Sequence, residues 1–168
     1  MTQFPIEELN QMNKSTFVDT LASVYETSPW VAERAASDRP FDSIKAVHES
    51  MRQAVQGASR DKQLELLQAH PDLGDRTKMT DASRDEQASA GLDQLSRKQY
   101  EAFQQLNETY REAFGFPFIM AVKGASPDVI QETMENRVDN SESEEFQTAL
   151  DEVHEIARLR LNELLIPY

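Results

Sequence analysis

The 168-residue sequence contains no cysteine, only five glycines and no long hydrophobic run. Without cysteine, the chain cannot form disulfides, thiolate nucleophiles, iron–sulfur clusters or cysteine-type zinc sites. A membrane-spanning helix needs about 20 consecutive apolar residues, and the longest apolar runs fall far short of that length. The first residues, Met1–Pro5, combine neither a basic region nor an apolar core, so we expect no signal peptide.

Positive charge is also scarce, because 17 lysines and arginines stand against 30 aspartates and glutamates, for a formal net charge of −13. Such an acidic surface repels phosphate backbones and anionic membranes, so we expect no nucleic-acid and no membrane partner. The three histidines have no His-Glu-x-x-His or His-x-His spacing, so we expect no bound metal. His48 and His154 fall on helix faces rich in Glu and Gln, where we expect them to be solvated.

The composition is typical of a globular protein, with 39% hydrophobic and 28% charged residues. No internal repeat, low-complexity segment or linker divides the chain, so we expect one domain over residues 1–168. Apolar residues recur at helical spacing along almost the whole chain, and no set of alternating strands is present. The sequence therefore predicts an all-α fold of about seven to nine helices.

Short polar residues and prolines predict where the helices begin. Asp42 is expected to cap a helix that ends at Gly57. Ser83 is expected to cap a short helix that ends at Gly91, after a loop over residues 71–82. The other predicted starts are Ser28-Pro29, Ser96, Ser126-Pro127 and Ser141.

The segment 115–124 departs from the helical pattern, since it is apolar but contains a proline and two glycines. We expect it to be extended and buried. Buried backbone groups outside a helix need other hydrogen-bonding partners. A polar ligand could supply them, or the segment could be a plain buried connector.

His70 begins the stretch His70-Pro71-Asp72-Leu73-Gly74, which follows a helical segment. Proline disfavours the helical conformation of the preceding residue, so the imidazole is placed at a fixed chain turn. Its ordinary pKa lies near neutral pH, which suits general acid–base catalysis. The alternative is a structural histidine that interacts with the helix dipole.

Ser83, Glu86 and Gln87 lie three and four positions apart in one helix, so they share one face. They could line an anion-attracting helix N-terminus, or Ser83 and Glu86 could form a simple capping box.

Arg158 and Arg160 lie two positions apart on the last helix and point in different directions. An arginine that points inward needs an anionic partner, and a substrate carboxylate would serve through bidentate bonding. The commoner arrangement is two surface arginines paired with Glu155 or Glu163. The sequence leaves open which arginine points inward.

Together these residues resemble the family of 2-oxo-4-hydroxy-4-carboxy-5-ureidoimidazoline (OHCU) decarboxylases. Four motifs occur in the family's order and span most of the chain. They are His70-Pro71-Asp72-Leu73-Gly74, Ser83-x-x-Glu86-Gln87 followed by Ala90-Gly91-Leu92, Phe114-Gly115-Phe116-Pro117-Phe118, and Ile156-Ala157-x-x-Arg160-Leu161.

The resemblance implies cofactor-free decarboxylation of a ureidoimidazoline to (S)-allantoin in urate degradation. By motif, His70 and Glu86 would be catalytic, with His70 as the acid–base residue, and Arg160 would hold an anionic or carbonyl part of the substrate. The other substrate-binding residues would be Pro71, Ser83, Gln87, Phe118, Ile119, Met120, Ala121 and Val122. The resemblance also implies a homodimer. Because Leu165–Tyr168 is no peroxisomal tripeptide, we expect a bacterial-type cytoplasmic enzyme.

Two other functions are compatible with the same residues. One is an all-α interaction module, with a structural His70 and an acidic surface that attracts a basic partner. The other is a ureide hydrolase, which would need an activated water, and the lack of metal-ligand spacing argues against it.

Overall fold

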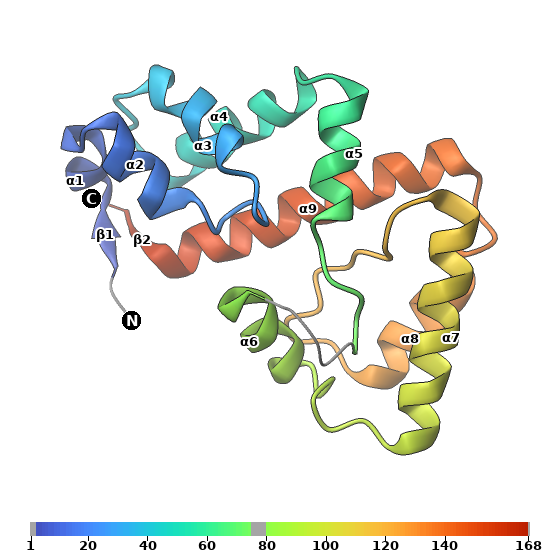
Figure 1. Ribbon diagram of the computed structural model, residues 1–168. Helices are drawn as coiled ribbons and strands as arrows, with labels where there is room; N and C mark the ends of the chain where they lie inside the picture. Colours follow the sequence, from blue (N-terminus) through green and yellow to red (C-terminus); the bar gives the residue numbers. More distant parts are fainter. Residues whose placement is uncertain (1–2, 75–79, 168) are drawn as a thin grey trace. The chain divides into compact units, whose positions relative to one another are not determined.

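The computed structural model describes residues 3–74 and 80–167 (Figure 1). Within these residues it contains nine α-helices, one short 3-10 helix and two strands of two residues each. The all-α prediction is therefore confirmed. The chain forms two compact units: the first runs up to Ala69 and resumes at His154, and the second comprises His70–Val153.

The first unit begins with strand β1 and continues through five helices. The elements are β1 (Phe4–Pro5), α1 (Ile6–Gln11), α2 (Lys14–Leu21), α3 (Pro29–Ala35), the 3-10 helix η1 (Ala36–Asp38), α4 (Ile44–Gln56) and α5 (Arg60–Gln68). α3 packs against both α2 and α4. The large side chains at the centre of this unit are fully buried and include Phe17, Leu21, Met51, Leu66 and Leu67.

The second unit contains three helices and most of a fourth. They are α6 (Asp81–Ser89), α7 (Arg97–Phe114), α8 (Pro127–Arg137) and α9 (Glu142–Leu164). The long helix α9, drawn in orange to red in Figure 1, contributes residues up to Val153 to this unit and the rest to the first. After α9, strand β2 (Leu165–Ile166) pairs in parallel with β1 in the first unit.

Most helices begin where the sequence predicts. Ser96, Ser126 and Ser141 accept hydrogen bonds from backbone N–H groups in the first turns of α7, α8 and α9. α3 begins after Ser28, although the Ser28 hydroxyl donates backward to the Glu26 carbonyl. These starts were predictable because capping depends on residues a few positions apart.

Two predicted helix starts are wrong. α4 is capped by Ser43 and not by Asp42, since the Ser43 hydroxyl accepts the Ala46 N–H at 3.0 Å. α6 is capped by Thr80, whose hydroxyl accepts the Ser83 N–H at 3.2 Å, so Ser83 lies inside the helix. The predicted loop over 71–82 is correspondingly shorter, and its residues 75–79 lie outside the described residues. In both cases a neighbouring hydroxyl residue fits the cap geometry.

The apolar segment after α7 is irregular and buried, as expected. Gly115 ends α7 in the left-handed conformation, with φ of 82°, which residues with a β-carbon rarely adopt. Residues 117–122 then form neither helix nor strand. The side chains of Phe116, Phe118, Ile119 and Val122 are buried.

Candidate functional site

The predicted catalytic histidine lies on a turn directly after α5. That helix ends at Gln68, and its C-cap is Ala69. His70 is 7% exposed, so its ring is largely removed from solvent. Pro71 follows it, as required for a chain that leaves the helix at this point. The ring is thus held at the start of the second unit.

The rest of the turn is bound to two other helices of the second unit. The N–H of Gly74 donates to Oε1 of Gln87 on α6 at 3.0 Å, and Nδ2 of Asn107 on α7 donates to the Leu73 carbonyl at 2.8 Å. Nη2 of Arg111 lies 2.6 Å from Oδ1 of Asp72 nearer the surface. Backbone hydrogen bonds to both α6 and α7 therefore hold the chain after His70.

Gly74 is required at this position for two reasons. Its φ of 78° lies in the left-handed region. A β-carbon here would approach Cδ1 of Leu95 to 3.1 Å, so a larger residue would disturb the turn that carries His70.

The three predicted polar residues, Ser83, Glu86 and Gln87, all lie on α6. Ser83 and Gln87 are buried, and Glu86 is half-buried. Glu86 therefore combines a carboxylate with partial access to solvent, as a group that meets a substrate must. The capping box proposed for Ser83 and Glu86 is not formed, because Thr80 is the cap.

Side chains bind the backbone of the irregular segment Phe118–Val122. Nη1 of Arg137 on α8 donates to the Ile119 carbonyl at 2.7 Å, and Oε1 of Glu152 on α9 accepts the Ala121 N–H at 3.2 Å. The segment thus has protein partners for two of the backbone groups that the sequence left without partners.

Arg137 is itself part of a buried polar cluster. Its Nε donates to Oε1 of Glu145 at 2.9 Å, and the same oxygen accepts the Tyr110 hydroxyl at 2.6 Å. Asn140 donates to the other oxygen of Glu145 at 2.9 Å. Burial raises the pKa of Tyr110, and the hydrogen bond to the Glu145 carboxylate raises it further.

Sequence reasoning missed Asn107, Arg137 and Glu145, although a signal was available for each. Asn107 lies between Phe103 and Tyr110 at helical spacing, on the buried stripe of α7. Arg137 follows Met134 by three positions on α8, and Glu145 precedes the buried Ala149 by four on α9. A polar residue within an apolar stripe predicts a buried, partnered group.

Arg160 is the inward-pointing arginine of the last helix. It is 7% exposed and belongs to the first unit, where Nη2 lies 2.9 Å from Oε2 of Glu26 and Nη1 donates to the Ser23 carbonyl at 2.8 Å. Glu26 is 2% exposed. Arg158 is exposed and pairs with Glu155, the surface arrangement considered for both arginines, and this contact lowers the pKa of the Glu155 carboxyl.

The prediction that His48 and His154 are solvated is wrong. His154 is buried, and its Nδ1 lies 2.8 Å from the Tyr25 hydroxyl. Nε2 of His48 lies 2.9 Å from the His154 carbonyl, and His48 is half-buried. Both histidines belong to the first unit. The partner of the His154 ring, Tyr25, lies 129 positions away in sequence, so the local sequence contained no sign of this burial. Burial raises the pKa of Tyr25.

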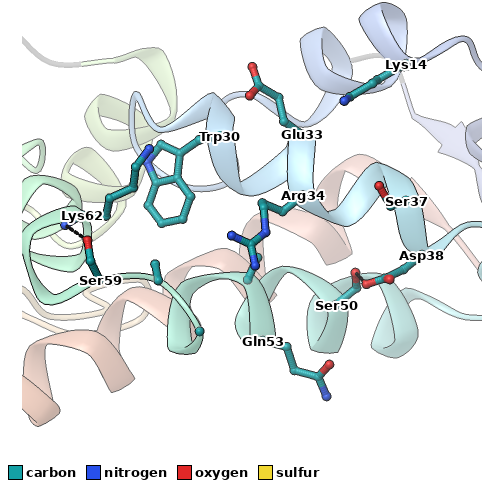
Figure 2. Close-up of a pocket in the computed structure, with 13 residues that line it drawn as sticks. Lys14, Trp30, Glu33, Arg34, Ser37, Asp38, Ser50, Gln53, Ser59 and Lys62 are labelled. Atoms are coloured by element: carbon teal, nitrogen blue, oxygen red, sulfur yellow. Dashed lines mark hydrogen bonds between the residues drawn. The ribbon is translucent and has the colours of Figure 1, made fainter.

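A separate groove of about 890 Å³ lies in the first unit and contains none of the predicted site residues. Figure 2 shows that Trp30 and Arg34 extend into it from α3, and that Lys62 approaches from α5, with its Nζ 5.0 Å from the centre of the indole ring. On the far side, Asp38 accepts a hydrogen bond from Ser50. The lining mixes both signs of charge.

Within residues 3–74 and 80–167, no group of three or more histidines and carboxylates could hold a metal ion. No helix of this described part is long and apolar enough to cross a membrane.

The fold and this residue set define an all-α protein with a buried histidine on a clamped turn and polar groups on a short helix. The profile of the OHCU decarboxylase family matches residues 10–162, and the chain belongs to that family.

Two relatives named 2-oxo-4-hydroxy-4-carboxy-5-ureidoimidazoline decarboxylase are similar over nearly their whole length. The protein from Haloferax volcanii is 62% identical over 97% of both chains, and that from Halalkalicoccus jeotgali is 60% identical over 99% of this chain and 95% of its own. A crystal structure of (S)-allantoin synthase is 31% identical, with a TM-score of 0.78 over 95% of this chain. This chain spans 53% of that longer chain.

Proposed function

We propose that this protein converts 2-oxo-4-hydroxy-4-carboxy-5-ureidoimidazoline to (S)-allantoin in urate degradation, and that His70 is its proton donor. Family membership over residues 10–162 makes the chain a decarboxylase, a carboxy-lyase. The observation that supports the role of His70 is its burial on a turn fixed by Gln87 and Asn107. An imidazole that is held in one orientation can deliver its proton to one side of a bound substrate.

Decarboxylation breaks the bond between the ring carbon and the carboxylate, and the electron pair of that bond must be accommodated. The conjugated C=N and carbonyl groups of the ureidoimidazoline can accept it as CO2 leaves. The substrate thus supplies its own electron sink, and the resemblance to the family implies that no cofactor takes part. The protein's task is to orient the ring, stabilise the developing charge and deliver a proton.

The other proposed substrate contacts follow the family motifs. Glu86 would accept hydrogen bonds from the substrate hydroxyl or ureido N–H groups, and Gln87 would bind an amide edge. Backbone N–H groups of Phe118–Val122 would stabilise charge on the ring, and the buried Phe118 and Ile119 would exclude water. Arg160 would hold an anionic or carbonyl group of the substrate. The remaining proposed contacts are Pro71 and Ser83.

His70 would then protonate one face of the carbanion and take up a proton from solvent before the next turnover. Protonation from one side sets the S configuration, which unassisted decay in water cannot do. Control of the product's configuration therefore explains why an enzyme is needed for a reaction that the substrate can also undergo without one.

The test follows product chirality by circular dichroism after purified protein is mixed with freshly generated ring-opened urate product. We expect rapid formation of (S)-allantoin by the wild type and nearly complete loss of that signal with His70→Asn. His48→Asn is the matched control and should behave as the wild type, because His48 is not among the proposed site residues and its ring bonds to a backbone carbonyl in the first unit. Substantial stereospecific turnover by His70→Asn would overturn the assignment, and no reaction with the wild type would favour an interaction module.

Three further properties are part of the proposal. Residues 1–168 act as one functional domain, supported by a family match that runs through both compact units. The enzyme is a homodimer, as the family resemblance implies, and it acts in the cytoplasm. Light scattering of the purified protein tests the dimer, since a single species of one chain's mass, 19.1 kDa, would contradict it.

A further inference from the structure

We propose that Arg137 is a positioning residue for the decarboxylation, and that it acts by fixing the peptide between Ile119 and Met120 so that the Met120 N–H faces the substrate. The inference rests on the proposed function, in which the Phe118–Val122 backbone lines the substrate site. Arg137 touches no reacting atom in this proposal. Its effect passes through the segment that it holds.

Arg137 binds the segment at two points. Nη1 donates to the Ile119 carbonyl at 2.7 Å, and the guanidinium carbon lies 4.4 Å above the centre of the Phe118 ring. Arg137 is 8% exposed and Phe118 is fully buried, so both contacts are shielded from water. A hydrogen bond from a charged group is about twice as strong as one between neutral groups.

Glu145 also holds the guanidinium in place. It is fully buried, and its Oε1 accepts Nε of Arg137 at 2.9 Å. Tyr110 and Asn140 donate to the same carboxylate, so Glu145 is itself fixed by α7 and by the connection before α9. Arginine can bridge a carboxylate and a carbonyl in this way because its donors form a rigid planar fork.

The geometry of the peptide bond carries the effect to the substrate side. The peptide is planar and trans, so the Ile119 carbonyl and the Met120 N–H point in opposite directions. When Arg137 holds the carbonyl, it directs the Met120 N–H away from the buried cluster. The next donor, the Ala121 N–H, is taken by Glu152. The Met120 N–H is therefore the backbone donor that Arg137 orients.

A purely structural role explains this arrangement less well. A buried ion pair is often no more stabilising than apolar side chains of the same volume. The segment, however, has no helix or strand ladder over residues 117–122, so the side-chain bonds from Arg137 and Glu152 help directly to fix its peptide planes. A preorganised N–H donor aimed at developing charge is among the larger contributions to catalysis.

The test compares Arg137→Lys with Asn140→Ala. Lysine keeps a positive charge beside Glu145 but cannot hold both Glu145 and the Ile119 carbonyl in one fork. Asn140→Ala removes a bond to the same carboxylate and leaves the Arg137–Ile119 bond in place. We measure the melting temperature, kcat and KM separately, and the enantiomeric excess of the allantoin formed.

We expect Arg137→Lys to lower kcat/KM by about tenfold, the factor that corresponds to one positioned hydrogen bond. We also expect a lower enantiomeric excess, because a less constrained ring presents both faces to His70. Asn140→Ala should keep the wild-type enantiomeric excess. A merely structural role would reduce the amount of active enzyme and leave KM and the enantiomeric excess unchanged.

If Arg137→Lys does not fold, Glu152→Ala and Glu152→Gln replace it, since glutamine retains an oxygen that can accept the Ala121 N–H. Loss of enantiomeric excess in the alanine variant with rescue by glutamine supports control of stereochemistry by this backbone. Unchanged enantiomeric excess and KM in whichever variant folds overturns the inference. An active wild type with an inactive His70→Asn would then leave the proposed function standing, whereas an inactive wild type removes both.

Discussion

Oε1 of Gln87 accepts the N–H of Gly74 at 3.0 Å, and this buried hydrogen bond links α6 to the turn after His70. This hydrogen bond joins two of the family motifs through residues that lie 13 positions apart. Gln87 contributes its oxygen to the protein itself, so its amide NH2 is the part that would serve a substrate carbonyl.

Replacement of Gln87 by methionine tests this structural role. Methionine has a similar volume but leaves the buried Gly74 N–H without its acceptor, so we expect the free energy of unfolding to fall by about 1–3 kcal/mol. Urea denaturation measures the change. Gln104→Met on the exposed face of α7 is the matched control and should change stability by less than about 0.5 kcal/mol. Equal stabilities for the two variants would show that the contact does not hold the turn.

The pair Glu26–Arg160 predicts that Arg160 cannot simply be deleted. Arg160→Met should cost about 3–5 kcal/mol, because it removes the arginine that pairs with the buried Glu26 carboxylate. The double variant Glu26→Gln with Arg160→Met should recover much of that loss. Urea denaturation of both variants, with kcat/KM measured on folded protein only, separates stability from substrate binding. No recovery in the double variant would contradict the ion-pair explanation.

Tyr25 and Tyr110 predict a loss of stability in alkali. Burial raises the pKa of both hydroxyls above the ordinary value of 10.0. Above pH 10 the unfolded chain therefore releases protons that the folded chain retains, and unfolding becomes more favourable as pH rises. Below pH 10 the two groups have no effect on the pH dependence.

The expected slope above pH 10 is about 1.4 kcal/mol per pH unit for each tyrosine. Denaturant unfolding between pH 9 and 11.5 measures it, in the wild type and in the double variant Tyr25→Phe with Tyr110→Phe. The variant should be less stable at pH 8 but should show a shallower slope above pH 10. Identical slopes would contradict the prediction.

The net charge of −13 predicts that salt stabilises the fold. Excess negative charge opposes the compact state, and salt screens exposed charges beyond about 10 Å at 0.1 M. The melting temperature at pH 7.5 should rise between 0.05 and 1 M NaCl, and equally with KCl. Near pH 4.6, the calculated isoelectric point, the rise should shrink. A melting temperature that is flat or falls with salt at pH 7.5 would count against this account.

Trp30, the single tryptophan, allows the one-domain prediction to be tested. It lies in the first unit, so its fluorescence follows that unit, while far-ultraviolet circular dichroism follows all helices. Because α9 runs through both units, we expect the two signals to give one unfolding midpoint in urea. Two separate midpoints would mean that the units unfold independently.

The features predictable from the sequence are those that depend on neighbouring residues. Ser96 and Ser126 begin helices because a hydroxyl needs only a backbone N–H two or three positions further on. The turn at His70-Pro71 and the irregular segment after Gly115 follow from proline and glycine at those positions. The motifs that carry the family resemblance are likewise short and local.

Tertiary structure decided which polar residues are buried and what they bind. His154 and Arg160 have sequence surroundings like those of solvated residues, yet both are buried, because Tyr25 and Glu26 reach them from 129 and 134 positions away. Arg137 and Glu145 likewise acquire their roles only when α8, α9 and the irregular segment pack together. The free energy of a buried charge depends on its partner, and no local pattern specifies a partner so distant in sequence.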